Sequence, residues 1–345
     1  MFFMSDNTGP AHPAIMRALT EANSGFAAPY GADDWTAAAV ANLRDVLEAP
    51  KASVNLVATG TAANSIALAA LCPPWATTFC SSVAHIHEDE CNAPEFYSGG
   101  AKLTLVGDGE KLTPESLRAA IEAEEIRGVH GPQRGPVSIT QATEKGTLYS
   151  PAEIRAICDV AHGYGLKVHM DGARFANAVV SLGVTPAELT WKAGVDALSF
   201  GGTKNGLMGV EAIVMFDPDP DWEVQLRRKR GAHLFSKQRF LGAQMAEYVR
   251  DGLWLETARA ANALCATLAE GLRAKGAVLD YEPEANIIFA RLPRSTHARL
   301  QAAGAQYYLW DSALDGGSDD DMLLARFVCD WSLPRTSVEE FLSLL

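Results

Sequence analysis

Two short segments of the chain carry side chains that could do chemistry together. The segment HMDGAR (169–174) holds Asp171, and the segment SFGGTKNG (199–206) holds Lys204. A pyridoxal phosphate enzyme needs such a pair, because a carboxylate keeps the pyridine nitrogen protonated and a lysine joins the aldehyde as a Schiff base. A helix-capping aspartate and a solvated lysine are the alternative. The first interpretation predicts an enzyme whose cofactor acts as an electron sink.

The flanking residues suit that chemistry. Gly201, Gly202 and Gly206 surround Lys204, and glycines let the backbone turn sharply while leaving room for a planar ring. Asp171 follows the alternating segment LKVHM (166–170), which predicts a strand. Asp171 would then lie at the carboxyl end of that strand, where α/β sheets bind their ligands.

A phosphate site is predicted in ATGTAANSIAL (58–68), where Gly60 and Thr61 open a helix after a predicted strand. The first turn of a helix has unpaired N–H groups and the positive end of the helix dipole, and a glycine there allows an anion to approach. An ordinary capped helix is the alternative. Thr203, just before the lysine, could add a hydroxyl to the same phosphate, or it could be a solvated turn residue.

The segment HIHEDE (85–90) contains four residue types that bind metals, at His85, His87, Asp89 and Glu90. A metal site requires these side chains to converge, and a spacing of two places them on one face only in an extended segment. We therefore predict no metal. A divalent-metal hydrolase remains as a remote alternative, and a buried core histidine as another.

Predicted helices and strands alternate along the chain, as they do in a parallel sheet covered by helices. The predicted strands are residues 53–59, 102–107, 135–140, 167–170, 197–201, 211–216 and 285–292. Prolines at the first helical position predict helices after Thr113, Ser150 and Thr185, and the last two also have a capping glutamate. A long helix is predicted from one face that carries Leu264, Leu268 and Leu272.

Composition limits the class of partner. Lys and Arg number 29 against 42 Asp and Glu, a net charge of −13, which favours a small-molecule substrate over nucleic acid or an anionic membrane. The start of the chain lacks a basic region and a long apolar run, so a cytoplasmic location is expected. The six cysteines form no C-x-x-C pair, and we predict reduced thiols without a disulfide or zinc.

Taken together, HMDGAR and SFGGTKNG resemble the motifs of the threonine aldolase family, a branch of the fold type I pyridoxal phosphate enzymes that resemble aspartate aminotransferase. The resemblance continues, in the order of the family, through SDNTG (5–9), PYGADDWT (29–36), ATGTAANSIAL (58–68), AHIHEDECNAPEFYSGGAKL (84–103), ITQATEKGT (139–147), TPAELTWKAGVD (185–196) and ARFVCDW (325–331). It thins between about residues 215 and 320. After Lys204 the chain reads GLMGVEA where a GxxVGEA-like order is expected, although the distance to Glu211 is kept.

The resemblance implies a fold. It indicates an α/β large domain with a mostly parallel, seven-stranded type of sheet covered by helices, and a smaller C-terminal α/β domain. We expect residues 1–25 to contribute to the site, residues 26–235 to form the large cofactor-binding domain and residues 236–345 to form the small domain. The family also implies a homotetramer made of two tight dimers, with the site at a subunit interface.

The resemblance also assigns roles to individual residues. It places His85 against the face of the cofactor ring, as a stacking partner and candidate base, with Asp89 nearby. Arg326 would bind the substrate carboxylate with its planar guanidinium. Arg174 would reach both the phenolic oxygen of the cofactor and the substrate carboxylate.

Three further positions are assigned to the substrate. Ser5 and Tyr30 correspond to family positions that line the site, and Tyr30 is expected to act across the subunit interface. His130 is a candidate for contacting the substrate hydroxyl, and it is matched only through its spacing of eight residues from Ser138. A frayed turn and a loop tyrosine are the alternatives for Ser5 and Tyr30.

The expected activity is retro-aldol cleavage of the Cα–Cβ bond. L-Threonine, L-allo-threonine and other β-hydroxy-α-amino acids would yield glycine and an aldehyde, and the L configuration is implied by the resemblance alone. A phenylserine-selective aldolase and a β-eliminating lyase would use the same lysine and aspartate. Serine hydroxymethyl transfer is less expected, because no segment is assignable to a folate, and a pure interaction module is remote.

Overall fold

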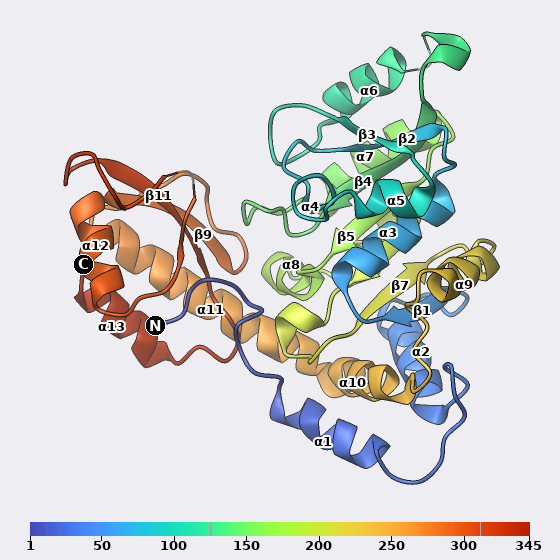
Figure 1. The fold of residues 1–345 in the computed structure, drawn as a ribbon, viewed down its shortest axis with the longest axis horizontal. Coiled ribbons are helices and arrows are strands. Elements are labelled where there is room, and N and C mark those ends of the chain that lie inside the picture. Colours follow the sequence, from blue (N-terminus) through green and yellow to red (C-terminus); the bar gives the residue numbers. More distant parts are fainter. Residues whose placement is uncertain (125, 311) are drawn as a thin grey trace.

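The chain folds into a larger and a smaller α/β part that are joined by one long helix (Figure 1). This computed structural model describes residues 1–124, 126–310 and 312–345. The joining helix, α11 (Leu253–Ala274), packs on α8 (Phe175–Leu182) of the large part and on the strands and last helix of the small part. The predicted fold class is confirmed.

The large part is built on a seven-stranded sheet with the order β1-β7-β6-β5-β4-β2-β3. Its strands are β1 (Ser53–Val57), β2 (Ala76–Cys80), β3 (Lys102–Leu105), β4 (Gln133–Thr140), β5 (Val168–Gly172), β6 (Ala197–Phe200) and β7 (Glu211–Met215). β7 is antiparallel to both of its neighbours, and the other pairs are parallel. The six predicted strands of this part are confirmed.

Strand β2 was not predicted. All five of its residues are buried, including Thr77 and Thr78, so the sequence ATTFC has neither the alternation of a half-exposed strand nor a continuous apolar run. Central parallel strands are covered on both faces, which removes the period of two that identifies a strand in a sequence.

Helices cover both faces of the large sheet. They are α1 (Pro13–Ala22), α2 (Asp34–Val46), α3 (Gly60–Leu71), α4 (His85–Glu88), α5 (Ala93–Ser98), α6 (Pro114–Ala123), α7 (Pro151–Gly163), α8, α9 (Asp221–Arg230) and α10 (Arg239–Val249). On one face α3 contacts α5 and α9, and on the other α6 contacts α7. The buried residues of α6, α7 and α8 share one continuous apolar core with the strands.

Two of the three predicted helix starts are confirmed. Thr113 and Ser150 are the N-caps of α6 and α7, each within a reciprocal capping box. The third prediction is wrong. Thr185 and Glu188 do exchange the expected hydrogen bonds, but only turns follow, up to the short 3-10 helix η2 (Trp191–Ala193). Thr190, which has φ −125° and ψ −109°, interrupts the helix.

The small part packs three helices against a four-stranded antiparallel sheet with the order β10-β11-β9-β8. The elements are β8 (Val278–Leu279), β9 (Ile287–Pro293), α12 (Arg294–Ala302), β10 (Tyr308–Leu309), β11 (Met322–Val328) and α13 (Arg335–Ser343), together with the end of α11. The predicted strand at 285–292 and the predicted long helix are confirmed, and Leu268 and Leu272 of that helix are buried.

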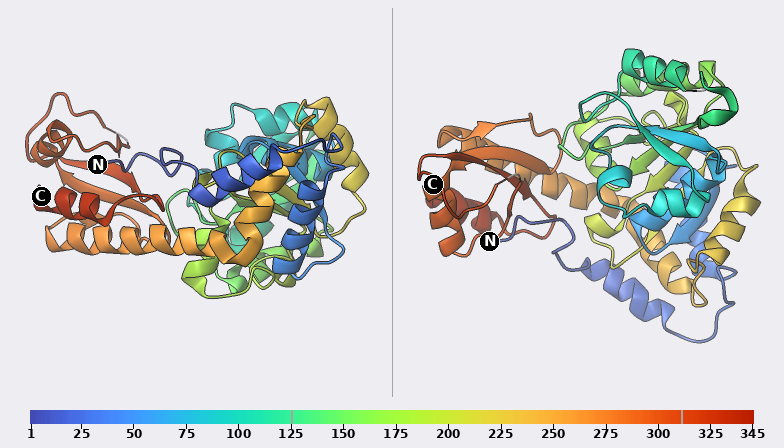
Figure 2. Two further views of the ribbon diagram at one scale, coloured as in Figure 1. Left: turned by 90° about the horizontal axis from the view of Figure 1, so that it is seen from below. Right: turned by 45° about the horizontal axis from the view of Figure 1, so that its top comes forward.

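The N-terminal segment runs from the small part to the large part (Figure 2). Phe3 is buried in the core of the small part and exchanges backbone hydrogen bonds with Gln306 and Val328. The chain then passes the carboxyl edge of the large sheet, and α1 packs beside α10. None of the helices in the described ranges is long and apolar enough to cross a membrane.

For the two domains we propose a boundary within α11, in place of the predicted limit between residues 235 and 236. Trp254 and Ala258, in the first half of α11, belong to the core of the large sheet, as does much of α10. Cys265 and Leu268, in the second half, belong to the core of the small sheet. A boundary inside this helix would assign each half to the core that it fills.

Candidate active site

A cavity of about 280 Å³ lies at the carboxyl ends of the parallel strands. The predicted residues that line it are Gly60, Thr61, His85, Asp171, Thr203 and Lys204. Asp171 lies in β5, and Lys204 lies in the 3-10 helix η3 (Thr203–Asn205) directly after the neighbouring strand β6. The structure therefore brings together the two residues on which the cofactor prediction rests.

Asp171 is buried and held by two donors. Its Oδ2 accepts a hydrogen bond of 2.9 Å from Asn64 Nδ2, and its Oδ1 accepts one of 3.0 Å from the backbone N–H of Ala173. Burial alone would raise the pKa of Asp171. The positive charges of His85 and Lys204, together with the N–H of Ala173, outweigh burial and lower that pKa below its ordinary value. Asp171 is thus a carboxylate at neutral pH.

His85 is oriented by Glu90, which was considered from the sequence only as a possible metal ligand. His85 Nδ1 lies 2.8 Å from Glu90 Oε1, and Asn64 Nδ2 donates to the same oxygen at 2.8 Å. Burial lowers the pKa of His85, but the hydrogen bond to Glu90 and the charge of Asp171 raise it more, so the net shift is upward. The short helix α4 turns Asp89, which was predicted to lie near the ring, into solvent and buries Glu90 instead.

The possible metal ligands of HIHEDE converge only in part. Ligand atoms of His85, Glu90 and Asp171 lie within 4.8 Å of one another, whereas His87 and Asp89 are exposed. The hydrogen bonds among His85, Glu90 and Asn64 account for this approach without an ion.

The predicted phosphate end is the N-terminus of α3. Thr59 is the N-cap, and its Oγ1 accepts a hydrogen bond of 3.2 Å from the N–H of Ala62. Gly60 faces open space, because a Cβ built on it would meet nothing within 4 Å. Thr203 Oγ1 is buried and has no hydrogen bond partner among the described residues. A free hydroxyl, a bare glycine and a helix N-terminus form a suitable phosphate cradle.

Glu211 is a second buried carboxyl group in the same cavity. Its Oε2 accepts a hydrogen bond of 2.7 Å from the N–H of Gly202, two residues before Lys204. Burial raises the pKa of Glu211 to about 7, although the side chain of Thr203, the N–H of Gly202 and the charge of Lys204 act in the opposite direction. Glu211 therefore fixes the turn that carries Lys204 while holding a proton near neutral pH.

We expect the free energy of unfolding of the Glu211→Gln variant, relative to that of the natural protein, to increase as pH rises. The ordinary pKa of the group is 4.5 and the folded value is about 7, so between these values the folded protein keeps a proton that the unfolded chain releases. The stability that this proton confers is complete below pH 4.5 and is lost as pH rises through 7. By pH 8 the loss is about 3 kcal/mol.

Urea unfolding of the cofactor-free protein at several pH values measures this difference. Exposed Glu115 of α6 supplies the control. The free energy of unfolding of Glu115→Gln should differ from that of the natural protein by an amount that hardly changes with pH. A Glu211→Gln difference that stays constant or shrinks with rising pH would show that Glu211 is an ordinary carboxylate.

Arg174 binds Asp6 of the N-terminal segment within the protein interior. Its Nε and one terminal nitrogen donate to the two carboxylate oxygens at 2.7 and 3.0 Å. Asn286 of the small part donates to the same carboxylate at 3.1 Å. Asp6 was missed although its motif SDNTG was recognised. The predicted residue of that motif, Ser5, instead accepts a hydrogen bond of 3.1 Å from the N–H of Asn7.

Arg326 lies in β11 of the small part, beside aromatic rings. Its guanidinium carbon is 5.2 Å from the ring centroid of Trp310 and 5.9 Å from that of Tyr308. Its Nε is buried and has no hydrogen bond partner among the described residues. Burial lowers the pKa of Arg326, and the charge of Arg174 lowers it further. A half-buried guanidinium with an unused donor is suited to bind a carboxylate.

Two predicted residues lie away from the cavity of their own chain. Tyr30 is 49% exposed on the loop before α2, with the amino group of Lys229 4.9 Å from its ring centroid. His130 is exposed in the 3-10 helix η1 (Gly128–His130), which precedes β4. β4 is parallel to β5, so His130 lies at the end of the sheet opposite Asp171. His130 therefore does not line the cavity of its own chain, and its contact with the substrate stays a prediction.

Comparisons with known proteins support the class that this fold and cavity define. A family model described as beta-eliminating lyase matches residues 3–295. The fold is also that of a serine palmitoyltransferase from Sphingomonas wittichii, with a TM-score of 0.72, 16% identity, and coverage of 100% of this chain and 86% of the other. The class is that of α/β lyases with a large and a small domain.

More similar relatives narrow this class. The chain is 42% identical to a low specificity L-threonine aldolase of Pseudomonas aeruginosa, over 98% of this chain and 95% of the relative. A low specificity L-threonine aldolase of Pseudomonas sp. strain NCIMB 10558 gives the same identity and coverage. The threonine aldolase structure of Leishmania major aligns with a TM-score of 0.92 and 26% identity, over 99% of this chain and 98% of the other. The chain therefore belongs to the threonine aldolases of the beta-eliminating lyase family.

Proposed function

We propose that this protein cleaves L-threonine, L-allo-threonine and other β-hydroxy-α-amino acids to glycine and an aldehyde, as a pyridoxal phosphate-dependent lyase. The observation that carries the proposal is the presence of Asp171 and Lys204 in one cavity, within a chain 42% identical to low specificity L-threonine aldolases. A metal-dependent hydrolase would not need Lys204 there.

The residues of the cavity fit the cofactor. Lys204 would hold its aldehyde, Asp171 its pyridine nitrogen, and Gly60, Thr61 and Thr203 its phosphate. The unpartnered hydroxyl of Thr203 and the open space at Gly60 support the phosphate end. When bound, pyridoxal phosphate accepts the electron pair of the bond that breaks next to the substrate amine.

The protein groups would orient the substrate. Arg326, with its unused Nε, would bind the substrate carboxylate, and Arg174 would lie behind it, fixed by Asp6. Holding the carboxylate fixes which substituent of Cα lies perpendicular to the cofactor ring, and that substituent is the one that leaves. His85 would face the ring, oriented by Glu90.

We further propose that the protein works in the cytoplasm as a homotetramer made of two dimers, with each site completed by a neighbouring subunit. Two observations support a subunit interface. Tyr30 does not line the cavity of its own chain, and an apolar cavity of about 680 Å³ lies between α1 and α10, with Met16, Leu19 and Phe240 in its wall. An apolar hollow on the surface is a common place of contact with another protein chain.

The test of the function is an absorption spectrum of the purified holoenzyme with acetaldehyde measured in the same cuvette. A yellow band that changes on addition of L-threonine or L-allo-threonine, together with the release of acetaldehyde, is the expected result. Release of pyruvate from L-serine, without aldehyde from threonine, would indicate a β-eliminating lyase instead. A preference for phenylserine would appear as a higher kcat/KM with benzaldehyde as the product.

A further inference from the structure

The segment that follows β4 carries an acidic residue to the same edge of the sheet as Asp171. Thr140, the last residue of β4, pairs with Asp171 of β5. A tight turn comes next, in which the N–H of Gly146 donates to the carbonyl of Thr143 at 2.9 Å. Glu144 and Lys145 occupy the tip of this turn. The segment belongs to ITQATEKGT, one of the motifs that resemble the family, but none of its residues was predicted to act in the site.

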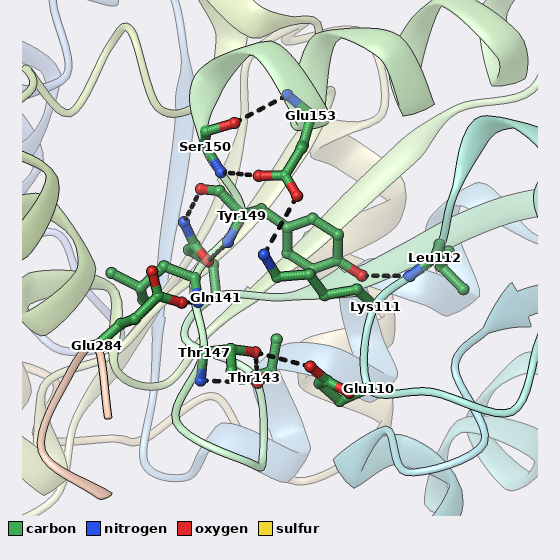
Figure 3. A network of polar contacts seen from close by, with 11 residues as sticks. Glu110, Lys111, Leu112, Gln141, Thr143, Thr147, Tyr149, Ser150, Glu153 and Glu284 are labelled. Carbon is green, nitrogen blue, oxygen red and sulfur yellow. Dashed lines mark hydrogen bonds and ion pairs between the residues drawn. The ribbon is translucent and has the colours of Figure 1, made fainter. Parts of the chain in front are cut away.

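A polar network holds the turn in place (Figure 3). Thr143 Oγ1 and Thr147 Oγ1 lie 2.8 Å apart, and Thr147 Oγ1 donates to Glu110 Oε1 at 3.2 Å. The small part adds two contacts, since Glu284 Oε2 accepts from the N–H of Leu148 at 2.8 Å and the N–H of Glu284 donates to the carbonyl of Gly146 at 3.0 Å. The turn is thus fixed from both domains.

The two side chains at the tip have different neighbours. The amino group of Lys145 lies 4.7 Å from the ring centroids of both Phe289 and Trp310, and Arg326 contacts the same Trp310. Lys145 therefore binds aromatic rings of the small part. Glu144 is half-buried beside it, and its negative charge acts on the guanidinium groups of Arg174 and Arg326 and on the imidazole of His85.

His85 is held in place through one of its two ring nitrogens. Its Nδ1 is engaged with Glu90 at 2.8 Å. Although burial opposes the shift, Glu90, Asp171 and Glu144 raise the pKa of His85, so the imidazole tends to keep its proton. A base must accept a proton at the operating pH. Glu144, on the turn that follows β4 beside Asp171, brings a carboxyl group whose charge acts on His85 and on both arginines.

We infer that Glu144 is the base that accepts the proton of the substrate β-hydroxyl. This inference rests on the proposed function. As the O–H bond breaks, its proton moves to the Glu144 carboxylate, the C=O bond of the aldehyde forms, and the Cα–Cβ bond breaks with its electron pair left on the side of Cα. A proton from solvent then completes glycine at Cα, and Glu144 returns its own proton to solvent.

Glutamine at position 144 should separate this step from the rest of catalysis. We expect Glu144→Gln to lower kcat for L-threonine cleavage by about 100- to 10 000-fold. Glycine has the same amine and carboxylate but no β-hydroxyl, so the exchange of its α-proton with solvent deuterium should stay within about threefold of the natural enzyme. Glu144→Asp should recover part of the cleavage rate.

A readout without cofactor tests the position of Glu144. In the cofactor-free protein, histidine titration followed by NMR should show a lower pKa of His85 in Glu144→Gln, because a neighbouring negative charge is lost. Glu282→Gln, which removes an exposed carboxylate paired with Arg273, is the matched control and should leave both measurements unchanged.

Each outcome decides the question. Equal losses in threonine cleavage and glycine exchange, or an unchanged pKa of His85, would overturn the role of Glu144. A natural enzyme that exchanges the α-proton of glycine but cleaves no β-hydroxy amino acid would instead refute the proposed function.

Discussion

The Lys204→Ala variant is expected to lose the yellow colour of the bound cofactor and to cleave L-threonine at least about a thousandfold more slowly. Lys204 supplies the one amino group among the described residues that line the cavity. Alanine removes the covalent attachment without disturbing the turn, since Glu211 continues to accept the N–H of Gly202.

The measurement is the absorption spectrum after saturation with pyridoxal phosphate, followed by an assay for acetaldehyde. Lys192→Ala serves as the control, because Lys192 also lies in a 3-10 helix but pairs with Glu48 at the surface. The control should keep both colour and activity. A full band in Lys204→Ala that survives removal of free cofactor would contradict the central assignment of this site.

Asp171→Asn is expected to lower kcat by about 100- to 10 000-fold while changing KM far less. Asparagine can still accept a hydrogen bond from Asn64 or Ala173, so the architecture of β5 should be kept. What disappears is the negative charge that keeps the pyridine nitrogen protonated. The loss should therefore fall on the chemical step and leave binding of the substrate carboxylate nearly intact.

Steady-state kinetics with L-threonine separate these two effects. Asp159→Asn, on the exposed side of α7, is the control for removal of one carboxylate. If kcat of Asp171→Asn matched that of the natural protein, another group would have to hold the ring nitrogen. A large rise in KM with constant kcat would assign Asp171 to binding.

Local sequence patterns predicted those parts of the fold and site that depend on neighbouring residues. The alternation before Asp171 and the glycines around Lys204 lie within a few residues of the groups that they position, and both were found. Capping at Thr113 and Ser150 was predicted for the same reason. Thr185 shows the limit of such local patterns, because its capping hydrogen bonds form although no helix follows them.

Residues that depend on distant contacts were missed. Asp6 meets Arg174 across 168 positions of sequence, and no pattern near either residue indicates that pair. Asp89 was chosen over Glu90 because both follow the last residue of α4, where no regular period shows which side chain faces inward. Glu144 was overlooked because its neighbours come from both domains.

The N-terminal segment has a mechanical consequence. The small domain is connected to the large one at two separate places, through residues 4–12 and through α11. Two such connections act as hinges, so any rotation of the small domain is limited to an axis that passes near both. Asp6 belongs to the N-terminal connection, whereas Arg326 lies in β11 of the small domain, which would rotate. Such a rotation would move Arg326 relative to Lys204 while leaving the ion pair of Arg174 almost still.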